Sequence, residues 1–477
     1  MVKIDDASRK INQCRRPLKV KSSKAEIFSG VHKIPKLRFE DQQLTSFAGL
    51  VIMQQLFSKL GLKKRLRACF DHLGTSPIFG RHMIALVLIV HLMLGYRRLR
   101  DMDFYRDDLM VLRLLGLKKL PDVSTISRAL ARVDGKSILR LRNACREMLL
   151  ARIQALDLRR ITLDFDGSVL STGRMAEGAA VGFNKQKKGQ RSYYPLFCTL
   201  AQTGQVFDVL PRSGNVHDSN GALEFMLECV RLIRAACPGI IIEVRMDSAF
   251  FSDAIVTALQ AEGIEFTISV PFERFAELKS MIQGRHRWRC FNSEFSYFDA
   301  KWKPKKWDSR FRFLFIRRKV KIQSKEPVQL DMFIPHEQGY EFKVIVTNKQ
   351  TTMRKVLYFH NGRGSQENTF SELKSQCNMD YVAVRRLHGN HLYMMSAVFA
   401  HNLFRELHMM VHEKSRGTTE KRTALWQFTE ANTLRRTLLQ RAGRFTSPAG
   451  MLTLTMSANS AVKKGILHYI ERLKQAA

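Results

Sequence analysis

The stretch 161–170, ITLDFDGSVL, decides how the rest of the chain is interpreted. Apolar residues alternate with polar ones, which is typical of a strand with one buried face. The same period of two places the carboxylates of Asp164 and Asp166 together on the other face. Two acids on one face need a cation or strong hydrogen-bond donors beside them. A strand that runs into an Asp-Gly turn gives the same letters, so this stretch alone leaves both interpretations open.

The composition indicates a protein that binds a polyanion. The 477 residues include 79 Lys and Arg against 43 Asp and Glu, so the formal net charge at pH 7 is +36. The cations run through the whole chain, which favours nucleic acid over a membrane surface as the partner. Hydrophobic residues make up 45%, enough for buried cores, and a chain of this length predicts roughly two to four domains.

The cysteines and the apolar runs indicate a soluble, cytoplasmic protein with no membrane partner. Eight cysteines are scattered without a CxxC pair, which favours reduced thiols over a zinc ribbon or a disulfide framework. The N-terminus has no apolar signal region. The apolar run 83–94 contains His91 and is shorter than the ~18 residues that a membrane-spanning helix needs.

A helical region precedes the first strand. Within it, residues 107–115 and 125–133 predict two short helices separated by a Pro-Asp turn. This is the outline of a helix-turn-helix, and its second helix carries Arg128 and Arg132. Most helical hairpins bind no DNA, but the net charge favours DNA binding here.

From residue 156 the pattern changes to a strand, a hairpin, and then helices alternating with strands. This order predicts a ribonuclease H-like layer, a mixed sheet with helices on its faces. A basic and aromatic stretch with three of the four tryptophans interrupts it, so we expect an inserted β-rich subdomain. Trp302 lies among cations there. It could stack on an unpaired base or pack a small sheet.

The predicted fold class is therefore α/β, in an α+β multidomain chain with helical N- and C-terminal regions. The expected divisions are a basic flexible arm at 1–40, a helical DNA-binding region at 41–155, the first part of the ribonuclease H-like core at 156–270, the β-rich insertion at 271–340, the second part of the core at 341–385, and a C-terminal helical region, a possible dimer element, at 386–477.

Three acids are expected at one edge of the predicted sheet. Asp166 is on the first strand, Asp247 ends the strand that enters beside it, and Glu367 is on the helix after the last strand. Carboxylates without Cys or His ligands favour Mg²⁺ or Mn²⁺, and two such ions about 4 Å apart can cleave a phosphodiester. Arg363 and Lys374 fall on the helix face of Glu367, although a structural helix would use the same spacing for salt bridges.

Four segments in order resemble the DDE transposases of bacterial insertion sequences: LDFDGSV, YYPLF…RSGNVHDS, VRMDSAF and HNGRGSQENTFSELK. The last is similar to the Tyr-x2-Arg-x3-Glu-x6-Lys signature of the branch whose core is split by a β-strand insertion, with His360 in place of Tyr. The resemblance implies two Mg²⁺ or Mn²⁺ ions on the three acids, with Asp164 in a supporting role. It also implies that Arg363, Lys374 and His360 contact or position the DNA.

The activity that this resemblance implies is binding of an element's terminal inverted repeats, metal-dependent cleavage, and transfer of the 3′-hydroxyl into target DNA. Its implied partners are double-stranded DNA and a second copy of the chain in a synaptic complex. Its implied location is the bacterial cytoplasm, in association with the nucleoid. Two alternatives stay open: a stand-alone metal-dependent nuclease on the same core, and a DNA-binding regulatory protein without catalysis.

Overall fold

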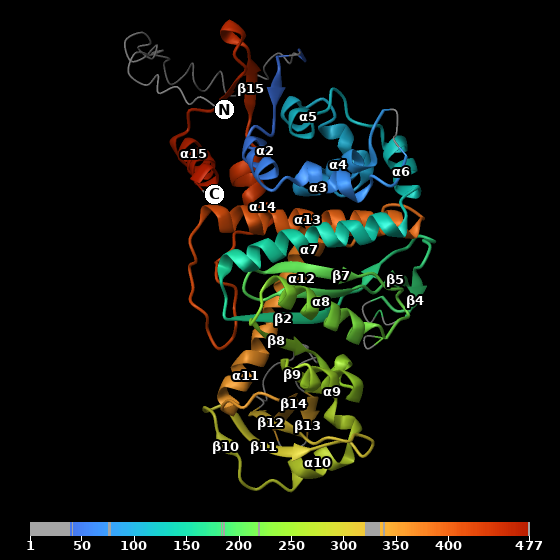
Figure 1. The fold of residues 1–477 in the computed structure, drawn as a ribbon, viewed down its shortest axis with the longest axis vertical. Helices are drawn as coiled ribbons and strands as arrows, with labels where there is room; N and C mark the ends of the chain where they lie inside the picture. Colours follow the sequence, from blue (N-terminus) through green and yellow to red (C-terminus); the bar gives the residue numbers. More distant parts are fainter. Residues whose placement is uncertain are drawn as a thin grey trace, which may run out of the picture. The chain divides into compact units, whose positions relative to one another are not determined.

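A mixed β-sheet runs through the centre of the protein, with its strands in the order β10-β11-β12-β14-β9-β8-β2-β6-β7 and β13 paired with β14 (Figure 1). This computed structural model describes residues 39–40, 42–74, 78–182, 184, 187–217, 220–319, 334–336 and 339–475. The predicted basic arm therefore lies almost entirely outside the described residues.

Five strands of the sheet have the predicted ribonuclease H-like arrangement. β2 pairs in antiparallel fashion with β6, and β6 with β7, whereas β2, β8 and β9 are parallel. The prediction of a mixed sheet built around residues 161–170 is confirmed. The bounds are β2 (Arg160–Gly167), β6 (Leu196–Leu200), β7 (Gln205–Leu210), β8 (Ile241–Met246) and β9 (Glu265–Val270).

The two faces of the sheet are covered differently. Phe165 of β2 is fully buried on one face, where its ring packs edge-to-face on Phe225 of α8 at 5.9 Å. On the opposite face, Phe197 of β6 packs against Phe370 of α12 at 5.1 Å. Asp166 pairs with Phe197 across the strands and so shares the α12 face. The helices concerned are α8 (Ala222–Ala236), α9 (Asp253–Ala261), α11 (Met353–Asn361) and α12 (Ser365–Ser375).

The predicted insertion adds strands to the central sheet. β12 pairs with β14 and with β11, so these strands continue the sheet beyond β9. The sequence pattern predicts the strands but carries no signal for the partner that they pair with. The bounds are α10 (Ala276–Gln283), β10 (Arg289–Cys290), β11 (Phe295–Trp302), β12 (Phe311–Lys319), β13 (Ile334–His336) and β14 (Tyr340–Thr347).

Helices α7 (Gly135–Leu156) and α13 (Leu387–Val411) run side by side between the N-terminal helices and the sheet (Figure 1). α13 packs on α4 and α7, and most of its residues are buried, including His401 and Asn402. This helix was predicted to be part of a dimer element, but its faces are covered within the same chain. A dimer role for the region 386–477 stays a prediction.

The two helices of the predicted helix-turn-helix both contact α4, and each also packs on a neighbour of its own. α5 contacts α2, whereas Ile126 and Leu130 bury α6 against α13. Arg128 and Arg132 are exposed, so DNA binding by this segment stays a prediction. The remaining helices of this region and of the C-terminus are α2 (Leu50–Lys59), α3 (Leu62–Cys69), α4 (Arg81–Met93), α5 (Leu109–Leu115), α6 (Val123–Ala131), α14 (Ala431–Leu434) and α15 (Ser460–Gln475).

Residues 413–430, here called the strap, connect α13 to the face of the sheet that carries α12. The backbone N–H of Leu425 donates to the carbonyl of Gln202 at 2.8 Å. Arg422 donates to both carboxylate oxygens of the fully buried Glu243 at 2.8 and 3.1 Å. A segment with a charged, linker-like sequence is therefore fixed to the core.

Smaller features complete the fold. Two three-stranded sheets are formed by β1 (Leu44–Thr45), β15 (Gly443–Thr446) and β16 (Thr453–Met456), and by β3 (Leu170–Ser171), β4 (Ala180–Val181) and β5 (Arg191–Tyr193). The cysteines of the described residues are free thiols, as predicted. In the part of the chain that the structure describes, no helix combines the length and the hydropathy needed to cross a bilayer.

Candidate active site

Two parallel strands bring the first two acids to one edge of the sheet. Asp164 of β2 lies opposite Arg245 of β8, so Asp166 and Asp247 follow two residues later at the carboxyl ends of neighbouring strands. Side chains two residues apart share a face, and both acids therefore lie on the α12 side. The carboxylate of Asp247 also accepts a hydrogen bond from the backbone N–H of Ala249 at 3.0 Å, which fixes the turn after β8.

Arg363 occupies the centre of this acidic edge. It lies between α11 and α12, in the short helix η5 (Gly362–Gly364), and donates from Nη1 to the Asp166 carboxylate at 3.0 Å. Burial alone would lower the pKa of Arg363. Attraction to Asp166, Asp247, Asp164 and Glu367 outweighs burial and raises it. The four acids singled out in the sequence analysis therefore all attract the guanidinium group of Arg363.

Helix α12 is docked on the strands that carry the acids. Gln366 donates from Nε2 to the carbonyl of Asp164 at 3.0 Å, and Phe370 packs on β6 as described above. Glu367 is exposed on this helix, and Lys374 is half-buried at its other end. Burial lowers the pKa of Lys374, while attraction to Asp380 and Asp166 acts in the opposite sense. The helix that carries Glu367 and Lys374 therefore lies on the face of the sheet that Asp166 shares.

Asp164 has a structural role. It is 1% exposed, and both of its carboxylate oxygens accept from Arg245, at 2.5 and 2.7 Å. Burial raises its pKa, while the charge of Arg245 and its hydrogen bonds act in the opposite direction. Arg245 also donates to the carbonyls of Phe359 and Lys421, at 3.0 and 2.7 Å. The pair therefore connects β2, β8, α11 and the strap.

His360 is an internal anchor of α11. Its side chain is 1% exposed, and its two ring nitrogens hydrogen-bond with the hydroxyls of Thr267 and Ser269 on β9, at 3.0 and 2.9 Å. Burial, followed by the charges of Lys343 and Arg363, lowers its pKa well below 6.5. A neutral, buried imidazole has no surface that DNA could touch. The DNA contact predicted for His360 is therefore replaced by a role in positioning the helix that precedes Arg363.

The other predicted DNA-binding residues lie outside the acidic edge. Arg128 and Arg132 are exposed on α6, where Arg128 hydrogen-bonds with Thr125 of its own helix. Trp302 packs edge-to-face on Phe275 and Phe313, at 5.3 and 5.0 Å. Its ring thus belongs to an aromatic cluster of the insertion, which matches the packing alternative stated above.

The donor types of the site fit a divalent metal ion, but their arrangement does not bring them together on one. Asp166, Asp247 and Glu367 offer only carboxylate oxygens, the ligands that Mg²⁺ and Mn²⁺ prefer. Among the residues that the structure describes, no three His, Cys, Asp or Glu side chains converge closely enough to hold an ion. The guanidinium of Arg363 is bound to Asp166 instead. Among the described residues, the predicted convergence on a shared ion site is not present.

Two contributors to the site were missed from the sequence. Arg245 stands within the apolar strand IIEVRM, and a buried arginine requires an acid nearby. That requirement is the signal that would have paired it with Asp164. Lys421 contributes a backbone carbonyl, which leaves no mark in the sequence.

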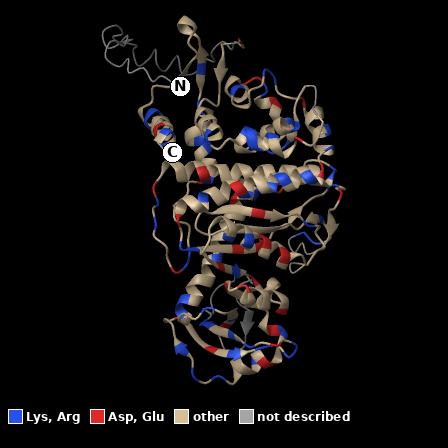
Figure 2. Cartoon of the chain, viewed as in Figure 1, with Lys and Arg blue, Asp and Glu red and all other residues tan. Residues whose placement is uncertain are grey.

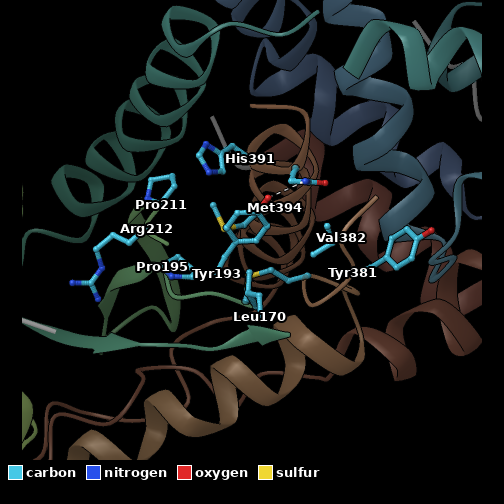
Figure 3. Close-up of a pocket in the computed structure, with 11 residues that line it drawn as sticks. Leu170, Tyr193, Pro195, Pro211, Arg212, Tyr381, Val382, His391 and Met394 are labelled. Atoms are coloured by element: carbon cyan, nitrogen blue, oxygen red, sulfur yellow. Dashed lines mark hydrogen bonds between the residues drawn. The ribbon is translucent and has the colours of Figure 1, made fainter. Parts of the chain in front are cut away.

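A small cavity elsewhere in the molecule is a packing gap. Its volume is about 20 Å³, roughly the space of one water molecule. Figure 3 shows Leu170, Tyr193, His391 and Met394 around it. The Tyr193 hydroxyl beside the cavity has a hydrogen-bond partner, since Asn390 donates to it at 3.2 Å. The described residues that line this cavity include no acid.

Comparison with known proteins decides the family. The profile of the family described as "Transposase DDE domain group 1" matches residues 30–477, which is nearly the whole chain. This protein belongs to that transposase family. The resemblance drawn from its four sequence segments is thereby confirmed, and the mixed α/β fold with a ribonuclease H-like strand order agrees with it.

Two solved structures similar to this chain are described as follows. A piggyBac transposase synaptic complex with hairpin DNA has 12% identity and a TM-score of 0.42, with 82% of this chain and 79% of that chain covered. A Mos1 mariner paired-end complex with Mn has 11% identity and a TM-score of 0.17, with 35% and 56% covered. No curated protein sequence matches this transposase.

Proposed function

We propose that this transposase binds the terminal inverted repeats of an insertion sequence, cleaves the DNA there, and joins the freed 3′-hydroxyl to target DNA. The observation that carries the proposal is the pairing of Arg363 with Asp166, together with the attraction of Arg363 to Asp247 and Glu367, at one edge of a ribonuclease H-like sheet. These acids come from three distant parts of the chain, and they are the acids that the family pattern selects. Mutual repulsion makes such a cluster unfavourable without a cation.

In this proposal each charged group has one task. Asp166, Asp247 and Glu367 would hold two Mg²⁺ or Mn²⁺ ions. Such ions activate the attacking oxygen and stabilise the leaving oxygen of a phosphodiester. Arg363 and Lys374 bind the DNA backbone beside the cleaved bond, where they also offset the repulsion between the acids and the phosphates.

The charge distribution supports DNA as the partner. Figure 2 shows Lys and Arg on the helical layer, the core and the insertion alike. The exposed Arg128 and Arg132 on α6 are part of this proposed surface. Two copies of the chain would hold the two ends of the element together, with surfaces other than the buried α13.

The decisive experiment mixes the protein with element-end DNA, target DNA and Mg²⁺ and measures joined products. We expect Asp166→Asn, Asp247→Asn and Glu367→Gln each to reduce joining by at least about a thousandfold while end binding changes little. Glu262→Gln is the matched control, because Glu262 is in a surface pair with Arg234 at 3.0 Å. Cleavage without joining by the wild type would favour a nuclease, and tight binding without cleavage a regulatory protein. Normal joining by any one of the three variants removes that acid from the site.

A further inference from the structure

Lys343 of β14 lies near the acidic edge, although no motif includes it. In the antiparallel pair of β14 and β9, Val344 is opposite Val270, so Lys343 lies just past the carboxyl end of β9. β9 is parallel to β8, whose own carboxyl end carries Asp247. Lys343 and Asp247 are therefore on strands separated by one strand, about 10 Å across the sheet.

The side chain of Lys343 shares the sheet face that carries the site. Ile345, two residues along the same strand, packs with Val356 and Leu357 of α11. Side chains two residues apart on a strand point to the same side. Lys343 thus faces the helix that ends at Arg363, on the side of the sheet where Ser269 binds His360.

The charged group that acts on Lys343 is another cation. The Lys343 side chain is half-buried. Burial and the charge of Arg363 lower its pKa to about 7. Two cations that repel each other are both stabilised by an anion between them, so the amine of Lys343 is placed to share an anion from outside the chain with Arg363.

We propose that Lys343 binds a backbone phosphate of the DNA strand next to the one cleaved at Asp166, Asp247 and Glu367. This inference rests on the proposed function. A phosphate bound there would pair with the ammonium of Lys343 and with Arg363. It would lie on the β14 side of the acids at the sheet edge. Lys343 would thereby fix the position of the strand along the sheet edge.

The test measures binding of end DNA in which single phosphates beside the cleaved bond are replaced by uncharged methylphosphonates. If the inference is correct, one substituted position weakens binding of the wild type by about tenfold. Lys343→Met should bind unmodified DNA about as weakly as the wild type binds the DNA substituted at that position. The same methylphosphonate should not weaken DNA binding by Lys343→Met any further. Lys279→Met, with an exposed lysine on α10, should behave like the wild type. Lys343→Gln replaces Lys343→Met if the latter fails to give the wild-type melting temperature.

The outcomes separate the two proposals. In one outcome the wild type cleaves and joins DNA, but each methylphosphonate weakens DNA binding by Lys343→Met as much as it weakens binding by the wild type. That result overturns the Lys343 inference and leaves the proposed function standing. If the wild type neither prefers end DNA nor joins it, the proposed function fails, and the inference fails with it.

Discussion

Arg363 is paired with one of the acids proposed to bind metal. It binds Asp166 at 3.0 Å, and it is attracted to the other acids of the site. A permanent positive charge on a short helix lets the acidic edge fold without metal. Metal binding must then compete with this guanidinium for Asp166.

We therefore expect Arg363→Gln to raise the affinity of the DNA-free protein for Mn²⁺ by roughly tenfold, because the variant removes both the competitor and a like charge. Titration followed by electron paramagnetic resonance measures free Mn²⁺ directly. Arg234→Gln, which breaks a surface pair with Glu262, should leave the affinity unchanged. An Arg363→Gln protein that binds Mn²⁺ no better than the wild type would show that Arg363 does not compete with metal.

A second prediction at this scale concerns the buried His401 of α13. Burial, and then the charge of Arg405, lowers its pKa to about 4, while Glu372 acts in the opposite direction. Because the folded-state pKa lies below the unfolded value of about 6.5, the unfolded chain takes up more protons under acidic conditions. The resulting stability is complete above pH 6.5 and is lost as the pH falls from 6.5 towards 4.

At pH 5.5 this loss is about 1.4 kcal/mol for His401. Thermal unfolding at pH 7.5 and pH 5.5 checks it. His401→Gln should show a smaller fall in melting temperature between the two pH values than the wild type. His286→Gln, at an exposed position, should show the same fall as the wild type. Equal falls in all three proteins would contradict the assignment.

At the scale of elements, the junction of α11 and α12 depends on a glycine. A Cβ atom at Gly362 would lie 1.9 Å from the carbonyl oxygen of Lys421 in the strap and 2.2 Å from Nη1 of Arg245. Gly364, two residues later, has nothing within 4 Å of that position. The strap can therefore approach Arg363 only because residue 362 lacks a side chain.

Gly362→Ala should lower the free energy of unfolding by roughly 1–3 kcal/mol or more, since the strap and Arg245 must move. Gly364→Ala is the matched control and should be neutral or slightly stabilising, because the backbone there is already helical. Calorimetry gives the stabilities, and limited proteolysis within 413–430 reports whether the strap has detached. Equal stability of the two variants would show that the close approach does not constrain the junction.

Local periodicity predicted the elements well and their partners poorly. The strand at 161–170, the hairpin after it and the helix that carries Glu367 follow from spacing alone. The pairing of β12 with β14, the contact of Arg422 with Glu243 and the burial of α13 join residues far apart in the chain, and no local pattern encodes such contacts. His360 shows the same limit, since its place in a motif indicates its position on α11 but not that β9 would bury it.

At the scale of the whole molecule, the net charge of +36 sets how binding responds to salt. Cations that neutralise phosphates release counterions from DNA, so the logarithm of the affinity should fall linearly with the logarithm of the salt concentration. With six to ten phosphate contacts, affinity should fall by roughly 10³–10⁵ between 50 and 200 mM salt. Filter binding or fluorescence anisotropy measures the slope, and a flat response would contradict phosphate-dominated binding.

The basic residues before position 39 offer a sharper version of this test. Lys10, Arg15 and Arg16 are among the cations of the predicted arm. Deletion of residues 1–38 should make the salt slope shallower by several units if the arm tracks phosphates. An unchanged slope would assign the arm to a solvated tail. The melting temperature of the remaining chain serves as the control for folding.

The burial of α13 and the anchoring of the strap bear on how gene copies decay. Both come after Glu367, the last of the three acids in the proposed site. A frameshift just past Lys374 would therefore keep every proposed catalytic group but remove the helix and the strap that pack against the core. Such a shortened product should be cleared as misfolded polypeptide and should not accumulate as a competitor that occupies the repeats. Inactive copies of the gene whose products still bind the repeats and repress the intact transposase would then have to arise by point substitution within the acidic edge.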